Sequence, residues 1–75
     1  GYYNTALGYD SLKANTTGFS NVSIGSRTLQ ANTTGNYNTA LGDAALLSAT
    51  TADSNTALGH YALLATTTGA ANTAV

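Results

Sequence analysis

Asn38-Thr39-Ala40-Leu41-Gly42 is the stretch that decides the fold, because it recurs along the chain at a constant spacing. It reads N-T-A-L-G at 4–8, 38–42 and 55–59, N-V-S-I-G at 21–25, and N-T-A-V at 72–75. Each copy begins 17 residues after the previous one. A fixed period of this kind is typical of architectures in which one supersecondary unit is stacked on itself.

The period divides the 75 residues into a single repeat array without insertions. The predicted coils are 1–17, 18–34, 35–51 and 52–68, followed by a partial coil at 69–75. Because the last coil stops in the middle of a unit, we expect the sequence to be an excerpt of a longer chain.

Each coil is predicted to contain two short strands and two turns. The frequent Thr, Asn and Gly disfavour a helix, and the apolar positions do not follow a helical period. Thr5 and Leu7 lie two residues apart and therefore share one face of a strand. The second coil has the β-branched Val22 and Ile24 at these positions, which favours an inward orientation. Leu12 and Ala14 form the second inward pair, so the predicted fold is an all-β, parallel β-solenoid (β-roll) of 17-residue coils.

Stacking places equivalent residues of successive coils above one another. The invariant asparagines should form an amide ladder, and the invariant glycines of the Gly8 position should form one corner of the coil. The N-T-T-G stretches at 15–18 and 32–35 should form the other corner, where glycine is free to take positive φ. The predicted core residues are Thr5, Leu7, Leu12, Val22, Ile24, Leu29, Leu41, Leu46, Leu58 and Leu63. The predicted ladder and turn residues are Asn4, Asn21, Asn38, Asn55, Asn72, Gly8, Gly25, Gly42 and Gly59.

The chain is expected to associate with further copies of itself. One coil buries too little apolar surface to be stable alone, and charged residues make up only 7% of the sequence. The small side chains at the Ala6 position are predicted to face outward and to allow the close approach of a neighbour. Leu47 and Leu64 are also expected to point outward and to need cover.

Composition excludes several functional classes. Lys13 and Arg27 are the only basic residues, which is too few for a nucleic-acid interface, and no apolar stretch could insert into a membrane. No nucleophile–base pair, phosphate loop or metal cluster is recognisable, so we predict no enzymatic activity and no cofactor. His60 is expected to be a surface residue without a bound metal, and Asp10 and Arg27 could form an exposed ion pair.

The N-V-S-I-G at 21–25 resembles the S-V-A-I-G signature of the head domains of trimeric autotransporter adhesins, the YadA-like heads. The N-T-A-L-G copies are similar to repeats in phage tail fibres, and the resemblance covers all 75 residues. It implies a left-handed β-roll assembled as a homotrimer, although the adhesin repeats are usually shorter. It also implies structural roles for Val22, Ile24 and the Gly8 position, and no catalytic role.

The expected function is that of a structural and adhesive fibre segment that mediates attachment. The expected location is extracellular, on a bacterial cell surface or a phage virion, and the expected partner is a host-surface glycan or protein. Candidate recognition residues are the aromatic side chains Tyr2, Tyr3, Tyr9, Phe19, Tyr37 and Tyr61.

Two alternatives remain open. One is a single-chain β-solenoid that forms an extracellular filament. The other is an ice-binding β-solenoid, which would need two outward threonine positions spaced two residues apart. Thr16 and Thr17 are adjacent and would point to opposite faces of a strand.

Overall fold

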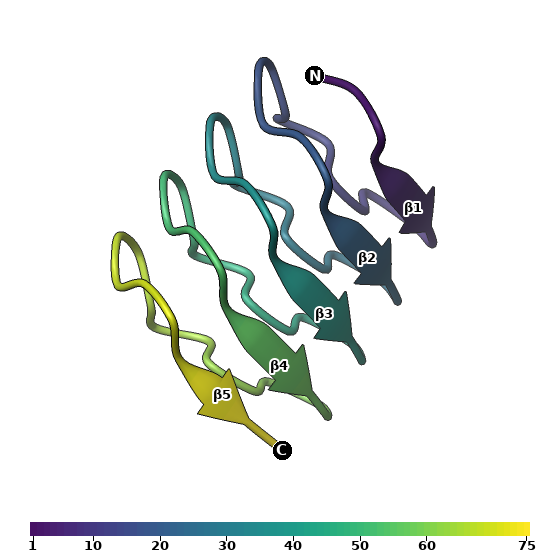
Figure 1. Cartoon of the computed structure of the whole chain (residues 1–75). Helices are drawn as coiled ribbons and strands as arrows, with labels where there is room; N and C mark the ends of the chain where they lie inside the picture. Colours follow the sequence, from purple (N-terminus) through teal and green to yellow (C-terminus); the bar gives the residue numbers. More distant parts are fainter.

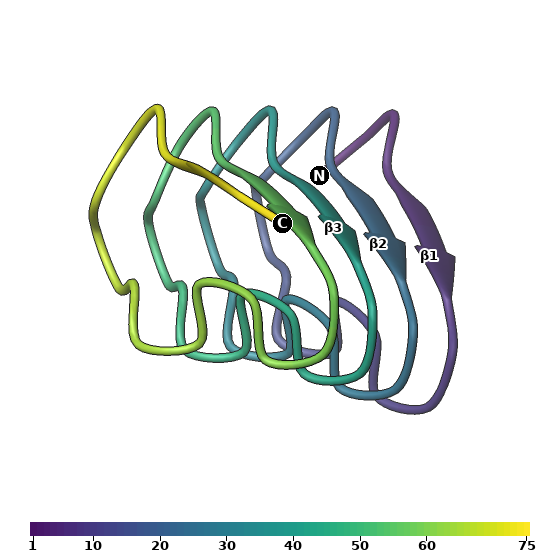
Figure 2. The same cartoon turned by 90° about the horizontal axis from the view of Figure 1, so that it is seen from below.

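The computed structural model describes all 75 residues and contains five short strands in one parallel sheet. The strands are β1 (Thr5–Leu7), β2 (Val22–Ile24), β3 (Thr39–Leu41), β4 (Thr56–Leu58) and β5 (Thr73–Ala74). They pair in sequence order, and each residue lies opposite its equivalent in the next repeat. Figures 1 and 2 show each of the strands β1 to β4 continuing into a loop that returns to the start of the next strand. The predicted all-β parallel β-solenoid is confirmed.

Each coil contains one strand instead of the two that were predicted. After the strand the chain folds into successive turns, closed by hydrogen bonds from the Lys13 N–H to the Asp10 carbonyl (3.3 Å) and from the Asn15 N–H to the Leu12 carbonyl (3.2 Å). Asp10 and Leu12 have φ angles of 57° and 55°, and the equivalent residues of later coils share this conformation. Since a strand needs negative φ, Leu12 and Ala14 cannot form a second one.

The middle residue of each central strand points into the coil. Ser23, Ala40 and Ala57 are buried, whereas the flanking Thr39 and Leu41 are exposed. These strands therefore present their larger side chains outward and their smallest side chain inward, the reverse of the predicted orientation.

Several core predictions are wrong as a result. Thr5, Leu7, Leu41 and Leu58 are exposed, and Val22 and Ile24 are only half-buried on the same outer face. The physical reason is the width of the coil: the interior opposite the leucine positions accommodates only Ala or Ser. The β-branched Val22 and Ile24 suit a strand on either face, so they did not indicate which face is buried.

The leucines that follow the strands form the core, as predicted. Leu12, Leu29 and Leu46 are buried, and Leu63 packs against them while partly buried. Ala14, predicted to be inward, is exposed. The rest of the core consists of alanines from the third and fourth coils, namely Ala40, Ala45, Ala49, Ala52 and Ala57.

The glycine that ends each repeated stretch is required by its backbone conformation and by the next coil. Gly42 has a φ of 129°, and a Cβ atom there would lie 2.6 Å from the backbone carbon and oxygen of Gly59. The predicted turn role of the Gly8, Gly25, Gly42 and Gly59 positions is confirmed, with φ between 124° and 130°. The expected positive φ at the N-T-T-G corner is wrong, since neither Gly18 nor Gly35 has it.

Backbone hydrogen bonds connect neighbouring coils along the turns as well as along the sheet. Only 8 of the 43 backbone hydrogen bonds lie within strands. Outside them, the Leu29 N–H donates to the Ala45 carbonyl (3.1 Å) and the Tyr37 N–H donates to the Phe19 carbonyl (3.1 Å). Hydrogen bonds therefore fix the backbone of each coil to that of the next over much of its length, which keeps the coils in the same conformation.

Candidate functional surfaces

An asparagine ladder runs the length of the solenoid at the start of the strands, and it is buried at Asn21, Asn38 and Asn55. The backbone N–H and the side-chain Nδ2 of Asn21 both donate to Oδ1 of Asn4, at 3.0 and 3.2 Å. Nδ2 of Asn21 also donates to the Gly35 carbonyl at 2.9 Å. Asn38 and Asn55 repeat this arrangement, and both side chains are fully buried. The predicted amide ladder is confirmed, and its role is structural.

A second, shorter ladder joins the first two coils at the same corner, since Nδ2 of Asn21 and Nδ2 of Asn32 both donate to the Gly35 carbonyl, at 2.9 and 3.2 Å. Nδ2 of Asn32 donates to Oδ1 of Asn15 at 3.0 Å. Oδ1 of Asn32 is buried without a hydrogen-bond partner, because the next coil has Ala49 at this position. A Cβ atom on Gly35 would lie 2.4 Å from this oxygen, and the residue equivalent to Gly35 in the next coil is Ala52. Glycine therefore accompanies asparagine in Asn15–Gly18 and Asn32–Gly35, and alanine accompanies alanine in Ala49–Ala52, whereas Gly69 follows Thr66.

This pairing was missed in the sequence, although the change of Asn to Ala at position 49 and of Gly to Ala at position 52, three residues further on, was a visible signal. It predicts that Ala49→Asn alone will not stabilise the chain, since the new amide would collide with the Ala52 methyl group. Combined with Ala52→Gly, the amide can donate to the unpaired Asn32 oxygen. We expect the double variant to exceed the sum of the single variants by about 1–3 kcal/mol in urea unfolding. Additive effects would contradict the pairing.

The outer sheet face exposes a row of aliphatic side chains. We define it by the outward side chains of the strands and of Val75: Thr5, Val22, Thr39, Thr56, Thr73, Leu7, Ile24, Leu41, Leu58 and Val75. Leu7, Leu41 and Leu58 are 66%, 43% and 42% exposed. None of the five charged residues of the chain lies in a strand. This face is therefore an uncharged ladder of aliphatic and threonine side chains.

The prediction that the small side chains at the Ala6 position form an outward docking surface is wrong. The equivalent Ser23, Ala40 and Ala57 line the interior, so they are not available to a neighbouring chain. Leu47 and Leu64, expected to point fully outward, are half-buried. The exposed aliphatic side chains of these strands, such as Leu41 and Leu58, lie on the opposite face.

Threonine does not form the paired outward array that ice binding requires. On the outer sheet face, the Thr39 position has an aliphatic neighbour two residues on, Leu41. At the far corner, the hydroxyl of Thr16 is engaged with the Thr33 carbonyl at 3.1 Å, and Thr17 is exposed beside it.

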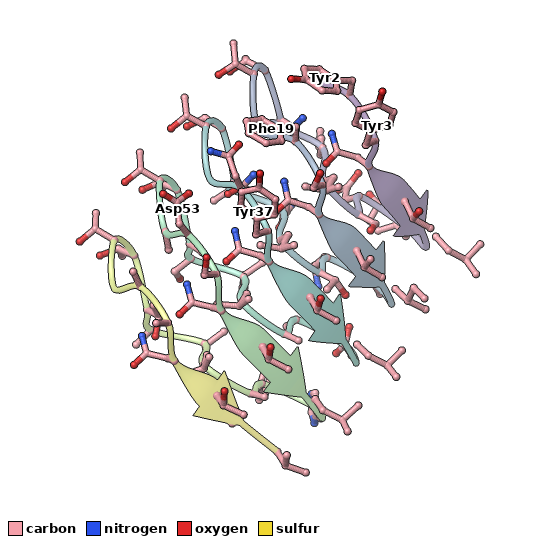
Figure 3. All side chains as sticks on the ribbon, in the orientation of Figure 1. Tyr2, Tyr3, Phe19, Tyr37 and Asp53 are labelled. Carbon is pink, nitrogen blue, oxygen red and sulfur yellow. The ribbon has the colours of Figure 1, made fainter.

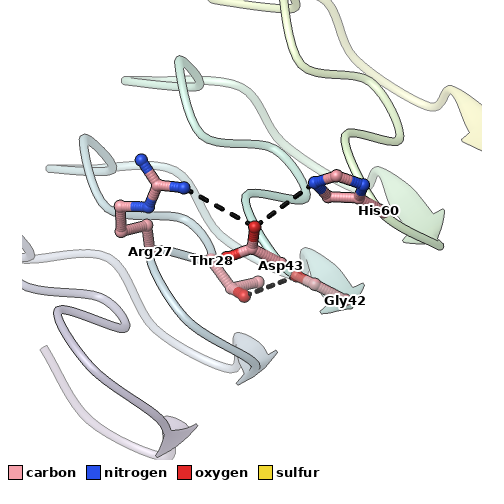
Figure 4. Close-up of polar contacts among 5 residues, drawn as sticks. All are labelled: Arg27, Thr28, Gly42, Asp43 and His60. Atoms are coloured by element: carbon pink, nitrogen blue, oxygen red, sulfur yellow. Dashed lines mark hydrogen bonds and ion pairs between the residues drawn. The ribbon is translucent and has the colours of Figure 1, made fainter.

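A row of polar side chains crosses three coils in the turns that follow the strands. Nη2 of Arg27 and Nε2 of His60 lie 3.5 and 3.3 Å from the same oxygen, Oδ2 of Asp43 (Figure 4). All three side chains are substantially exposed to solvent, so each contact contributes at most about 1 kcal/mol. The structure contains no group of three or more His, Cys, Asp or Glu side chains that could hold a metal ion.

The proposed Asp10–Arg27 ion pair is not formed. Oδ2 of Asp10 instead lies 3.8 Å from Nζ of Lys13, and it accepts a hydrogen bond from Nε2 of Gln30 at 3.2 Å. Arg27 reaches in the other direction along the stack, toward Asp43.

Four of the six predicted recognition residues gather at one corner, which we call the corner strip: Tyr2, Tyr3, Phe19 and Tyr37 (Figure 3). The Tyr2 and Phe19 rings are stacked, with centroids 5.3 Å apart and planes 6° apart. Tyr3 and Tyr37 extend the strip through edge contacts with Tyr2 and Phe19. Tyr9 and Tyr61 lie apart from it, in the turns after the strands, and Tyr61 stacks on His60.

These surfaces belong to a parallel β-solenoid. The chain has no pocket, so any ligand would bind on an exposed face. The structure has no helix long and apolar enough to cross a membrane. No family model, curated protein or solved structure matches the chain.

Proposed function

We propose that this chain is a structural and adhesive segment of a homotrimeric fibre, displayed on a bacterial cell surface or a virion. The observation that carries the proposal is the outer sheet face, where an uncharged row of aliphatic side chains is exposed on consecutive coils. A contiguous apolar surface of this kind favours burial against another protein surface.

A second copy of the chain suits this surface well. Parallel copies in the same register would place Leu41 and Leu58 against the same uncharged residues of the neighbour, with no charge desolvated. A stable interface buries roughly 800 Å² per partner, about a fifth of the 3750 Å² that the single chain exposes. The burial argument requires only more than one copy, and the resemblance to trimeric adhesin heads favours three.

Assembly also gives the fibre its mechanism. Coils that are hydrogen-bonded to one another make a stiff rod. Three copies present the same recognition surface, so that several weak contacts together give firm attachment. A single-chain filament joined only end to end would leave the outer sheet face in water, which is why we favour side-by-side assembly.

The proposal predicts that Leu41→Asp will weaken assembly. A carboxylate there would be desolvated at the interface, so we expect the association constant to fall about 10- to 100-fold in analytical ultracentrifugation. The matched control is Tyr61→Asp, at a position of similar exposure (48%, against 43% for Leu41) among the turns, and it should assemble as the unmodified chain does.

The unmodified chain should sediment at three times the monomer mass of 7.5 kDa. A single monomer boundary, together with β-type circular dichroism at micromolar concentration, would rule out the proposed assembly. Equal weakening by both substitutions would instead show that the sheet face is not the interface.

A further inference from the structure

We infer that the corner strip and the polar residues that continue it form a binding site for a neutral, extended glycan chain lying along the solenoid axis. The inference rests on the proposed attachment role, but it does not depend on the number of copies. Figure 3 shows the strip at the edge of the first three coils, with Asp53 further along the same corner.

The apolar part of the site is unusual for a surface of this size. Tyr3 and Tyr37 are 82% and 59% exposed, and neither ring is used to fill the core. Their hydroxyl groups make no hydrogen bond within the chain. Exposed tyrosines offer ring surface to the C–H groups of a sugar and a hydroxyl to its polar edge.

The polar part continues the same position of the repeat. Tyr2 and Phe19 are followed by Asn36 and Asp53, one coil further on each time. Oδ1 of Asn36 accepts the Phe19 N–H at 2.9 Å, and Oδ1 of Asp53 accepts the Asn36 N–H at 2.7 Å. These bonds hold both side chains in place and leave Nδ2 of Asn36 and Oδ2 of Asp53 without a partner in the chain.

A fixed donor and a fixed acceptor therefore lie on adjacent coils, roughly 4.8 Å apart along the stack, next to a row of rings. Neighbouring hydroxyls of a sugar need a donor and an acceptor in this way, and its C–H face needs an aromatic ring. The regular repeat of the solenoid suits a polymer that is itself extended and repetitive.

The charge distribution disfavours an anionic ligand. Asp53 is the only charged residue in the corner strip and its continuation, so nothing there attracts an anionic polymer. A second copy of the chain is better accommodated by the outer sheet face, where no polar group is left free except threonine hydroxyls.

The test is a ¹⁵N–¹H NMR titration of the whole chain with β-1,4-linked hexasaccharides of glucose, mannose and N-acetylglucosamine, and with hexagalacturonate as the anionic comparison. We expect at least one neutral probe to shift the amide signals of Tyr3, Asn36, Tyr37 and Asp53, with a Kd on the order of 1 mM. Hexagalacturonate should bind at least about tenfold more weakly.

The variants are chosen to keep the fold. Tyr37→Ser places serine where Ser20 and Ser54 already occupy the same positive-φ position, and it should weaken binding about tenfold. Asp53→Asn keeps the oxygen that accepts the Asn36 N–H but removes the free acceptor, and a similar loss is expected. The control, Tyr61→Ala, is equivalent to Ala44 and should bind as the unmodified chain does.

The site would be overturned if no neutral probe shifts these signals, if Tyr37→Ser binds unchanged, or if the anionic probe binds best. Dissociation of the assembly by Tyr37→Ser without any glycan effect would also overturn it, and would assign the strip to contacts between copies. Sedimentation of the same samples separates the two proposals, since a monomer that still binds glycan contradicts only the trimer.

Discussion

Asn38→Ala is expected to destabilise the chain by about 3–5 kcal/mol in urea unfolding, because two buried groups lose their partners. Oδ1 of Asn38 accepts both the backbone N–H and Nδ2 of Asn55, at 3.0 and 3.2 Å. Nδ2 of Asn38 donates to the Ala52 carbonyl at 2.7 Å. Alanine leaves the Asn55 N–H and the Ala52 carbonyl unpaired in a region from which water is excluded.

The matched control is Asn72→Ala, at the equivalent position of the last coil. Its backbone N–H, which donates to Oδ1 of Asn55 at 2.9 Å, is retained in alanine, and its exposed side chain makes no hydrogen bond within the chain. We expect a change below about 0.5 kcal/mol. If the two substitutions had equal effects, the ladder would not be a source of stability.

Leu29→Ala is expected to lower the free energy of unfolding by about 2–5 kcal/mol per chain, since it leaves a cavity in the middle of the row of core leucines. Leu29 is fully buried and belongs to the same core cluster as Leu12 and Leu46. Backbone hydrogen bonds hold the coils above and below it in register, so the stack has little freedom to close the cavity. Circular dichroism during urea unfolding measures the loss.

Leu7→Ala, compared with Leu29→Ala, distinguishes the effect of the outer sheet face on stability from that of the core. Leu7 is 66% exposed in the single chain, so its truncation should act only through assembly. Its effect on unfolding should therefore depend on protein concentration, whereas that of Leu29→Ala should be present at every concentration. An equally large and concentration-independent loss for Leu7→Ala would contradict the inward orientation of the Ala40 position.

Some features of the candidate sites could be recognised in the sequence, and others only in the structure. The aromatic residues were identified from the sequence because they are rare and occupy the positions that vary between coils. Their gathering into a strip follows from two adjacent positions of the repeat, but only the structure shows that the rings contact one another. The free donor of Asn36 and acceptor of Asp53 likewise emerge only when their other atoms are seen bonded to the neighbouring coil.

The sequence by itself determined the period, the stacking of like residues, the asparagine ladder, the glycine corners and the leucine core. Each follows from a 17-residue identity that must be repeated in space once the strands pair in register. The tertiary structure alone decided which strand face is buried. A period of two shows that Thr5 and Leu7 share a face, but not which side of the strand that face lies on. That choice depends on how far the leucine of the same coil reaches across the interior, and on the left-handed backbone at Leu12 that turns the chain back toward the strand and leaves room only for alanine or serine.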